Sequence, residues 1–432
     1  MTVTFYIEQF GCRATQADAA AIERQLRDRG CVAVSNRAEA DVVVVNTCTV
    51  TAAADAQARD AIRKIHAGNP AARIIATGCY AQRAPEELAA LPGVSHVVGN
   101  SHKPQIPSLV ASGLVPVDAL RTSSEDAVPG PAILTASILR QREFLSAPVL
   151  GGESGHTRPT LKIQDGCDLR CTYCVIPFVR GKSRSMPPEQ VITEVRRLVA
   201  AGAREIVLSG INLGTYGRDL APRADLLALL RRILEETWLD RLRLSSIEPQ
   251  DVTQDLIGLF ASTDRLAEHF HMPLQSGSDR ILAAMHRWYR AGHYARRVEL
   301  IRERLPHAAI GADVIAGFPG ETEDDHAATL AFIERLPFTY LHVFSFSARP
   351  GTPAAALPGQ VPAFVIKRRA RQLRALGEAK AAAFRRSQLG RPLRVLTLRR
   401  GAEDGNTTPA LSSNYLKLRI PGIYSPNMWA EI

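Results

Sequence analysis

Short apolar runs alternate with helical patterns along most of the 432 residues, and this alternation restricts the fold more than any other feature. In the first third, "VTFYIEQF" (3–10), "ADVVVVNT" (40–47) and "ARIIATG" (72–78) each precede a helical pattern. Strands separated by helices of this length form βαβ units, which build parallel sheets. We therefore predict an α/β protein whose residues 1–145 form a parallel-sheet, Rossmann-like domain.

A second series of strand-like runs follows a loop-rich stretch, and we place the domain boundary near Gly155. Amphipathic segments separate the runs of this series. The runs cover residues 160–166, 205–210, 241–246, 269–275, 309–318 and 339–347. Six parallel strands are too few for the eight-stranded barrel, so residues 155–360 are predicted to form a partial (β/α)6 barrel.

The end of the chain differs from the rest in charge. The net charge is +10, and residues 361–432 hold 14 Lys and Arg against 4 Asp and Glu, so the whole excess lies there. Residues 361–387 read as a basic helical connector, and residues 388–432 read as a small β-barrel. Clustered cations indicate a partner rich in phosphate, although a solvated basic helix would give the same pattern.

Composition excludes several other classes of protein. With 46% hydrophobic and 22% charged residues the chain is globular, and it lacks the uninterrupted apolar segment that a membrane span needs. The first residues lack the pattern of a signal peptide, so we expect a cytoplasmic protein without membrane contact. Seven cysteines, an odd number, favour metal ligation or chemistry over a disulfide framework.

Three cysteines follow the three strands of the N-terminal series. Cys12, Cys48 and Cys79 come directly after these runs. Because ligands bind at the carboxyl ends of strands in open parallel sheets, we expect the three thiols to meet at one edge. Cys31 comes before a strand instead, and is predicted to be a small buried hydrophobe.

A second set of three cysteines follows the first strand of the barrel. "GCDLRCTYC" contains Cys167, Cys171 and Cys174 but no fourth cysteine nearby. Structural zinc sites normally close with four ligands, whereas a [4Fe-4S] cluster held by three thiolates keeps one iron open for a substrate. A zinc site completed by His or Asp elsewhere, or thiols without a shared role, are the alternatives.

This second motif resembles the signature of radical S-adenosylmethionine enzymes. The resemblance implies that Cys167, Cys171 and Cys174 hold a [4Fe-4S] cluster whose open iron binds S-adenosylmethionine, and that an electron from it yields a 5′-deoxyadenosyl radical. A partial barrel is the usual fold of that superfamily.

Over nearly its whole length the chain resembles the methylthiotransferase family. The motifs are "FGC", "VVNTC", "ATGC", "PLQSGSD", "DVIAGFPGET" and "FSFSARPGT". The resemblance implies a second [4Fe-4S] cluster on Cys12, Cys48 and Cys79, and a C-terminal RNA-binding β-barrel of the TRAM type. One S-adenosylmethionine would methylate sulfur carried at this cluster, and another would provide the radical. The family commonly has Asn where this chain has Thr15.

The resemblance also suggests contacts for S-adenosylmethionine at the ends of the barrel strands, with barrel packing or turn formation as the alternative role of each residue. These residues are Ser209, Gly210, Glu248, Gln275, Ser276, Asp313 and Gly317. His269 and His271 alternate on the fourth strand, and at least one is predicted to be a hydrogen-bonded core residue.

Three substrates fit the family: threonylcarbamoyladenosine in tRNA, isopentenyladenosine in tRNA, and an aspartate of a ribosomal protein. "NTCTVT", "TGCYAQR" and "LSGINLGTYGRDL" resemble the threonylcarbamoyl branch. We therefore expect the tRNA anticodon stem-loop as a partner, together with an electron donor and a sulfur source. A non-catalytic, metal-stabilised RNA-binding protein is the alternative from another class. The predicted phosphate contacts are Lys367, Arg368, Arg369, Arg371, Arg374, Arg385 and Arg386.

Overall fold

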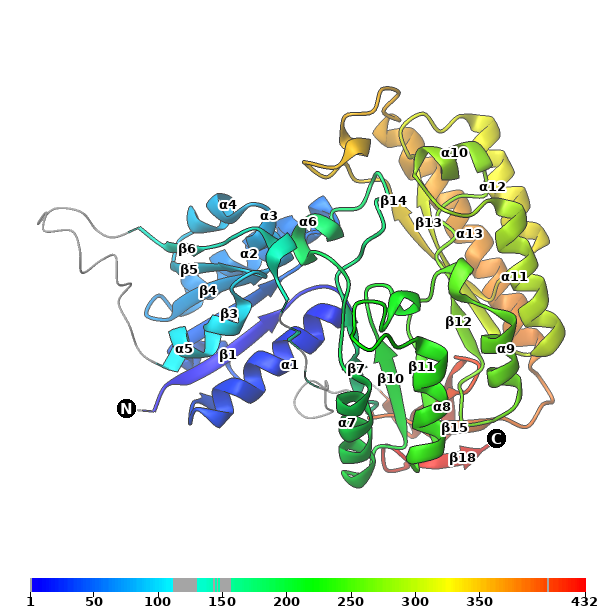
Figure 1. Cartoon of the computed structure of the whole chain (residues 1–432), viewed down its shortest axis with the longest axis horizontal. Coiled ribbons are helices and arrows are strands. Elements are labelled where there is room, and N and C mark those ends of the chain that lie inside the picture. Colours follow the sequence, from blue (N-terminus) through cyan, green and yellow to red (C-terminus); the bar gives the residue numbers. More distant parts are fainter. Residues whose placement is uncertain (1, 112–129, 143, 146, 148–156, 402–403) are drawn as a thin grey trace, which may run out of the picture. The chain divides into compact units, whose positions relative to one another are not determined.

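The computed structural model describes residues 2–111, 130–142, 144–145, 147, 157–401 and 404–432 (Figure 1). The chain divides into two compact units. The first comprises residues 1–149 with 165–169 and 174–183, and the second comprises 150–164, 170–173 and 184–432. The boundary predicted near Gly155 lies outside the described residues.

The first unit contains a six-stranded parallel sheet in the order β2-β1-β3-β4-β5-β6. The three predicted strands are confirmed as β1 (Thr4–Gln9), β3 (Val42–Thr47) and β4 (Arg73–Gly78). The strand expected after Cys31 corresponds to β2 (Val32–Ala33). The sequence did not indicate β5 (Val94–Gly99) or β6 (Ala132–Leu134). This strand order is the flavodoxin-like variant of the doubly wound fold, and it reverses direction between β1 and β3.

Helices cover both faces of this sheet because successive valines of β3 point to opposite sides. Val42 and Val44 pack with α1 (Arg13–Asp28) and α5 (Ile106–Ala111). Val43 and Val45 pack on the other face, whose core is closed by α2 (Ala52–Gly68), α3 (Cys79–Arg83) and α4 (Pro85–Ala89). Cys31 is buried in the first of these cores, as predicted.

The second unit contains the six predicted barrel strands, each shorter than its apolar run. They are β7 (Thr160–Lys162), β10 (Glu205–Ser209), β11 (Arg241–Leu244), β12 (His269–His271), β13 (Ala309–Ala316) and β14 (Tyr340–Ser345). All their pairings are parallel, and bridges such as Ser246 to His271 connect β11 with β12. The order is therefore β7-β10-β11-β12-β13-β14, an open partial barrel.

Crossover helices follow the barrel strands in turn. They are α7 (Pro188–Ala200), α8 (Leu226–Glu236), α9 (Gln254–Ala261), α10 (Asp279–Ala284), α11 (Ala291–Arg304) and α12 (Glu323–Arg335). Between β7 and α7 lie β8 (Gln164–Asp165), α6 (Ile176–Arg180) and β9 (Arg184–Ser185). The basic helix α13 (Ala363–Ser387) runs alongside β14, with α12 next to it (Figure 1).

The chain ends in a four-stranded antiparallel sheet, in agreement with a small TRAM-like barrel. Its order is β17-β16-β15-β18, with β15 Arg394–Thr397, β16 Thr407–Ser412, β17 Lys417–Pro421 and β18 Trp429–Glu431. Arg241 and Arg243 at the start of the barrel strand β11 donate to backbone carbonyls of residues 411–413. Both guanidinium groups also bind the fully buried Glu205, so a charged cluster fixes the sheet to the amino ends of β10 and β11.

Candidate active site

Three of the predicted cysteine ligands lie at the carboxyl ends of neighbouring strands in the first unit. Cys12 follows β1 and precedes α1, Cys48 follows β3, and Cys79 follows β4 as the first residue of α3. β1 and β3 are the pair at which the strand order reverses, and this switch point is where open α/β sheets bind ligands. The observed positions agree with the predicted meeting of these thiols at one sheet edge.

Two glycines allow the backbone to approach this edge closely. Gly11 has φ +99°, and a Cβ there would lie 2.9 Å from the Sγ of Cys48. Gly78 has φ +100°, and a Cβ there would lie 2.3 Å from the carbonyl oxygen of Thr47. Positive φ and lack of space both require glycine at these positions, so the Gly-Cys pairs of the sequence are structural requirements of the site.

The three thiols interact electrostatically. Burial, followed by the charges of Cys79 and Cys12, raises the pKa of Cys48 to about 12. Buried thiolates that repel one another need a bound cation to be stable, and a metal that binds them must displace the protons. Three soft sulfur donors without a fourth cysteine fit a [4Fe-4S] cluster with one open iron.

A buried charge network lies beside this triad. Arg180 donates to both carboxylate oxygens of Asp165, at 2.9 and 3.0 Å, and to Asp18 at 3.0 Å. Lys103 also binds Asp18, at 2.8 Å. Burial disfavours the charge of Arg180, but Asp165, Cys79 and Asp18 hold its pKa well above the usual range. The network therefore keeps a permanent cation within electrostatic reach of the cysteine site.

Thr15, which stands where the family commonly has Asn, forms hydrogen bonds with the backbone of Cys12 and the side chain of Asn46. Its hydroxyl donates to the carbonyl oxygen of Cys12 at 2.6 Å, and its own carbonyl accepts from Asn46 at 2.7 Å. Thr15 therefore fixes the backbone of the Cys12 turn.

The second set of cysteines lies on the loop after β8. The backbone N–H of Cys167 donates to the carbonyl of Gly181 at 3.0 Å, which closes the loop within the first unit. In the second unit, Thr172 contacts the end of α10. Its backbone N–H donates to the carbonyl oxygen of Met285 at 3.1 Å, and its hydroxyl donates to the carbonyl oxygen of Ala284 at 2.9 Å. Hydrogen bonds therefore hold this segment at its first cysteine and between its second and third cysteines.

The sequence did not indicate the residue that contacts the middle cysteine. Arg287, three residues after α10, donates from Nη1 to the Sγ of Cys171 at 3.1 Å, from Nε to the hydroxyl of Tyr289 at 3.2 Å, and from Nη2 to Glu248. Burial raises the pKa of Glu248, although Arg287 opposes this shift. One guanidinium group thus joins a predicted cluster ligand to a predicted cofactor contact.

The remaining predicted cofactor residues have different surroundings. Ser209 ends β10, and Gly210 follows in a tight turn where a Cβ would lie 2.9 Å from the Oε1 of Gln164. Gln275 has φ +66° and its backbone pairs with β13. Ser209, Gly210 and Gln275 therefore stay candidate contacts at the carboxyl ends of the strands.

Two of the predicted cofactor residues have their polar groups committed elsewhere. Ser276 is fully buried, and its hydroxyl lies 3.2 Å from the hydroxyl of Thr329 on α12. Gly317 donates its N–H to Glu321 at 2.8 Å, and a Cβ there would lie 2.3 Å from Ile366 of α13. Both residues stay predicted cofactor contacts, although these hydrogen bonds already engage the Ser276 hydroxyl and the Gly317 N–H.

The strand-four histidines are hydrogen-bonded core residues, as predicted for at least one of them. His269 and His271 are both buried, and each ring lies within 2.7 to 2.9 Å of the hydroxyl of Tyr340. His271 also reaches Asp313, at 2.9 Å. Burial would raise the pKa of Asp313, but hydrogen bonds from His271 and His342 hold it well below its usual range.

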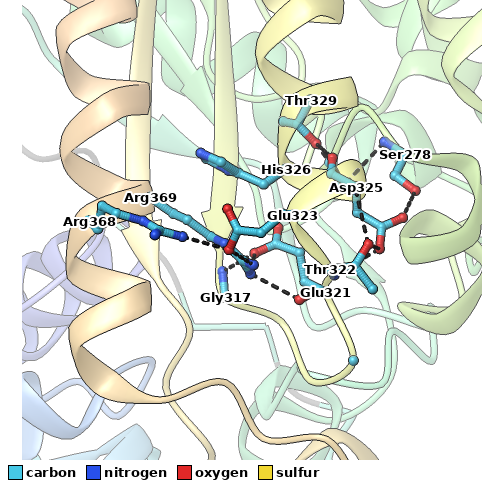
Figure 2. A network of polar contacts seen from close by, with 12 residues as sticks. Ser278, Gly317, Glu321, Thr322, Glu323, Asp325, His326, Thr329, Arg368 and Arg369 are labelled. Atoms are coloured by element: carbon cyan, nitrogen blue, oxygen red, sulfur yellow. Dashed lines mark hydrogen bonds and ion pairs between the residues drawn. The ribbon is translucent and has the colours of Figure 1, made fainter.

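One predicted RNA contact needs correction. Arg369 is 3% exposed, and it binds the backbone and the carboxylate of Glu321 at 3.0 and 2.7 Å and Glu323 at 2.7 Å. Figure 2 shows this side chain pointing from α13 toward the β13–α12 turn, where it meets both glutamates. Arg369 cannot reach a phosphate there, because it is a buried ion-pair partner. Arg368 pairs with Glu323 but stays half-exposed.

The other predicted RNA contacts are exposed on α13, as phosphate binding requires. These are Lys367, Arg371, Arg374, Arg385 and Arg386.

Two segments of the chain match protein-family models. Residues 4–99 match the Uncharacterized protein family UPF0004, and residues 161–333 match the Radical SAM superfamily. The radical S-adenosylmethionine methyltransferase TsrM from Kitasatospora setae has a similar fold, with a TM-score of 0.59 and 17% identity over 82% of this chain and 77% of that one. The partial barrel and its three-cysteine loop define a radical S-adenosylmethionine enzyme, whose cofactors are [4Fe-4S] clusters and S-adenosylmethionine.

Full-length relatives identify the family within this class. "Threonylcarbamoyladenosine tRNA methylthiotransferase MtaB" of Aquifex aeolicus is 37% identical over 98% of this chain and 97% of its own length. The protein of the same name from Bacillus subtilis is 36% identical over 98% and 90%. "tRNA-2-methylthio-N(6)-dimethylallyladenosine synthase" of Sphingopyxis alaskensis is 36% identical over 93% and 88%. The chain belongs to the radical S-adenosylmethionine methylthiotransferase family.

Within the described part of the chain, none of the helices has both the length and the apolar character that crossing a membrane would require.

Proposed function

We propose that this enzyme methylthiolates N6-threonylcarbamoyladenosine next to the anticodon of tRNA, inserting sulfur at an adenine C–H and adding a methyl group from S-adenosylmethionine. The observation that carries the proposal is the match over 98% of the chain to two relatives named for this reaction. The sheet-edge position of Cys12, Cys48 and Cys79 supports it, because sulfur transfer needs a second site besides the radical one.

The proposed ligands of the two clusters are the two sets of three cysteines, Cys12, Cys48 and Cys79 and then Cys167, Cys171 and Cys174. When bound, the clusters and S-adenosylmethionine supply the electron, the radical, the methyl group and the place where sulfur is carried. An electron donor and a sulfur source are the further partners that this chemistry requires.

The chain's own residues position and tune these groups. Arg287 fixes Cys171 and Glu248 relative to one another, because a planar guanidinium group donates in fixed directions. Arg180 places a buried positive charge within electrostatic reach of the other three cysteines, where it stabilises thiolate and sulfide charge. The proposed contacts of S-adenosylmethionine are Ser209, Gly210, Glu248, Gln275, Ser276, Asp313 and Gly317.

The proposed tRNA surface combines cations with an exposed aromatic ring. Lys367, Arg371 and Arg374 have the spacing of one helix face on α13 and neutralise phosphates there. Trp288 is 71% exposed, and it follows His286, whose ring bonds to the carbonyl of Arg170 in the cysteine loop. An indole at this place can stack on an unpaired anticodon-loop base.

Isopentenyladenosine in tRNA is the second candidate substrate, because relatives named for this nucleoside, under its other name dimethylallyladenosine, are nearly as similar. The test is an anaerobically reconstituted enzyme with reductant, S-adenosylmethionine and tRNA carrying one modification or the other. Mass spectrometry of the digested nucleosides should show a methylthio increase on threonylcarbamoyladenosine alone. An increase on isopentenyladenosine alone would replace the proposed substrate, and release of 5′-deoxyadenosine without either product would direct the search to the ribosomal-protein aspartate.

A further inference from the structure

A polar cluster on β12, β13 and β14 surrounds Asp313, a proposed cofactor contact, with His269, His271, Tyr340 and His342, none of which has a role in the sites described above. Leu341 of β14 faces the outside of the barrel, because a Cβ at Gly377 of α13 would lie 3.2 Å from it. Tyr340 and His342 alternate with Leu341 and therefore face the concave side. Gly311 of β13 leaves room there for the ring of Tyr340, since a Cβ at that position would lie 2.0 Å from it.

The cluster is connected by hydrogen bonds across the three strands. Two imidazole nitrogens contact the same carboxylate oxygen, Oδ1 of Asp313. Nε2 of His271 lies 2.9 Å from it, and Nδ1 of His342 lies 3.3 Å from it. The other nitrogen of His271 lies 2.9 Å from the hydroxyl of Tyr340, which in turn lies 2.7 Å from His269. Two rings donating to one anionic oxygen fix both imidazole orientations.

Exposure distinguishes the two ends of this cluster. His269 and His271 are buried, whereas the side chain of His342 is 56% exposed and that of Asp313 is 23% exposed. The ring of His342 is therefore accessible from solvent, whereas the rings of the two buried histidines are not. With Nδ1 directed at Asp313, the atom that His342 can offer a ligand is Nε2.

The chemistry of this surface separates the two candidate substrates. The threonylcarbamoyl group carries a carboxylate, a hydroxyl and a ureido group, all of which form hydrogen bonds. The isopentenyl group is an apolar hydrocarbon, and burying it against His342 would take the Nε2 of this ring out of water without giving it a hydrogen-bond partner. A site built from hydrogen-bonding groups rejects a ligand that lacks them more strongly than an apolar pocket rejects an added polar group.

We propose that His342, oriented by Asp313 and backed by His271 and Tyr340, binds the carboxylate of the threonylcarbamoyl group of the substrate nucleoside. The site rests on the proposed function and deepens it, because it names the residue that recognises the modification. A protonated imidazole held by one carboxylate donates its second N–H to another, and such charge-assisted bonds are the strong ones. His342 is then a specificity-determining residue on the inner face of the barrel.

Binding provides a test that does not depend on turnover. Fluorescence anisotropy would compare anticodon stem-loops that carry threonylcarbamoyladenosine, isopentenyladenosine or plain adenosine at the modified position. The wild-type protein should prefer the threonylcarbamoyl stem-loop by about 10-fold or more. The variant His342→Phe keeps a ring without donors and should lose this preference, while its affinity for the plain stem-loop stays unchanged. His342→Gln keeps a donor and should retain part of the preference.

Turnover and metal content complete the experiment. His342→Phe should lower kcat/KM on threonylcarbamoyl tRNA by about 10- to 100-fold, chiefly through KM, with normal iron content and normal 5′-deoxyadenosine release without RNA. His293→Phe, the same change on α11, is the matched control and should behave like the wild type. The variant Asp313→Asn should resemble His342→Phe in binding, because it removes the acceptor that orients the ring.

The outcomes distinguish the inference from the proposed function. Wild-type protein that prefers and modifies only the isopentenyl stem-loop overturns the proposed function, and the inference with it. A wild-type preference for threonylcarbamoyladenosine that both His342 variants keep overturns the inference alone. The ligand nitrogens of His271 and His342 and the carboxylate of Asp313 also lie within 4.8 Å of one another, close enough for a metal ion. A bound metal other than iron that His342→Phe loses would therefore make the cluster a metal site and overturn the proposal.

Discussion

Arg369 gives the sharpest test of the structure, because its position in a basic helix suggests one role and its surroundings another. Replacing it with Met removes the charge and keeps much of the side-chain volume. The lost contacts are two hydrogen bonds to Glu321 and one to Glu323. Glu321 has a side chain only 2% exposed, and its remaining described bond is the N–H of Gly317 at 2.8 Å. The variant therefore leaves a buried carboxylate without its counter-ion.

Breaking a buried ion pair by removing one partner destabilises a protein by about 3 to 5 kcal/mol. Figure 2 shows that this pair connects α13 to the turn before α12, so the loss falls on the docking of α13. If the amides of α13 exchange through local undocking, a loss of this size accelerates their hydrogen exchange by about 100-fold or more. Hydrogen exchange measured by mass spectrometry on peptides from residues 363–377 is therefore the assay.

The pH dependence of the defect follows from Glu321. Burial raises its pKa in the intact protein, although the Gly317 N–H and Arg369 oppose the shift, and removing Arg369 should raise the pKa further. A carboxyl group with a folded-state pKa above its unfolded value stabilises the fold at low pH, and this stabilisation is lost as pH rises through the folded pKa. The defect of Arg369→Met should therefore be larger at about pH 8 than at about pH 5.

Two variants serve as controls. Arg371→Met, on the exposed side of the same helix, should change the opening free energy derived from hydrogen exchange by less than about 0.5 kcal/mol. It should nevertheless weaken tRNA binding and make this binding less dependent on salt. Adding Glu321→Gln to Arg369→Met removes the unpaired charge and should recover part of the loss. Unchanged exchange in Arg369→Met, or a defect of equal size at both pH values, would refute the reasoning.

Three further predictions concern the cluster sites and the RNA surface. Cys48→Ala should remove one cluster and about half of the bound iron, whereas Cys31→Ala should keep the full iron content, as measured by iron analysis and Mössbauer spectroscopy. Arg287→Met should lower the midpoint potential of the radical cluster by on the order of 50 mV, because an N–H···S bond and a positive charge are lost; an EPR-monitored titration with an unchanged potential would contradict this. Trp288→Ala should weaken anticodon stem-loop binding by about 1 to 3 kcal/mol, while Trp238→Ala, which removes an even more exposed indole next to β11, should not; equal effects would exclude base stacking.

Much of the fold could be predicted because its signals are local. Three strands of the first unit and all six barrel strands were visible as apolar runs followed by helical patterns. β5 and β6 were missed, and the reason is that "VSHVVG" and "AIL" are too short or too mixed to stand out from loops. The flavodoxin-like strand order also required the structure, because the order in which strands pair depends on contacts distant in sequence.

The sequence by itself determined the class of chemistry. One set of cysteine ligands follows the strands directly, and the other lies within a few residues of sequence. Both sets, Cys12, Cys48 and Cys79 and the 167–174 motif, can therefore be recognised from the sequence. The sequence also located the basic helix, since charge is a property of composition.

Only the tertiary structure decided what individual polar residues do. In the sequence, Arg369 is one of seven similar cations predicted to bind phosphate. The structure shows that it is buried and paired with Glu321, 48 positions earlier. Arg287 meets Cys171 across 116 positions, and His342 meets Asp313 across a strand pair. The physical reason is that the energy of a charged group depends on its burial and on its partners, and packing brings those partners together from distant parts of the chain.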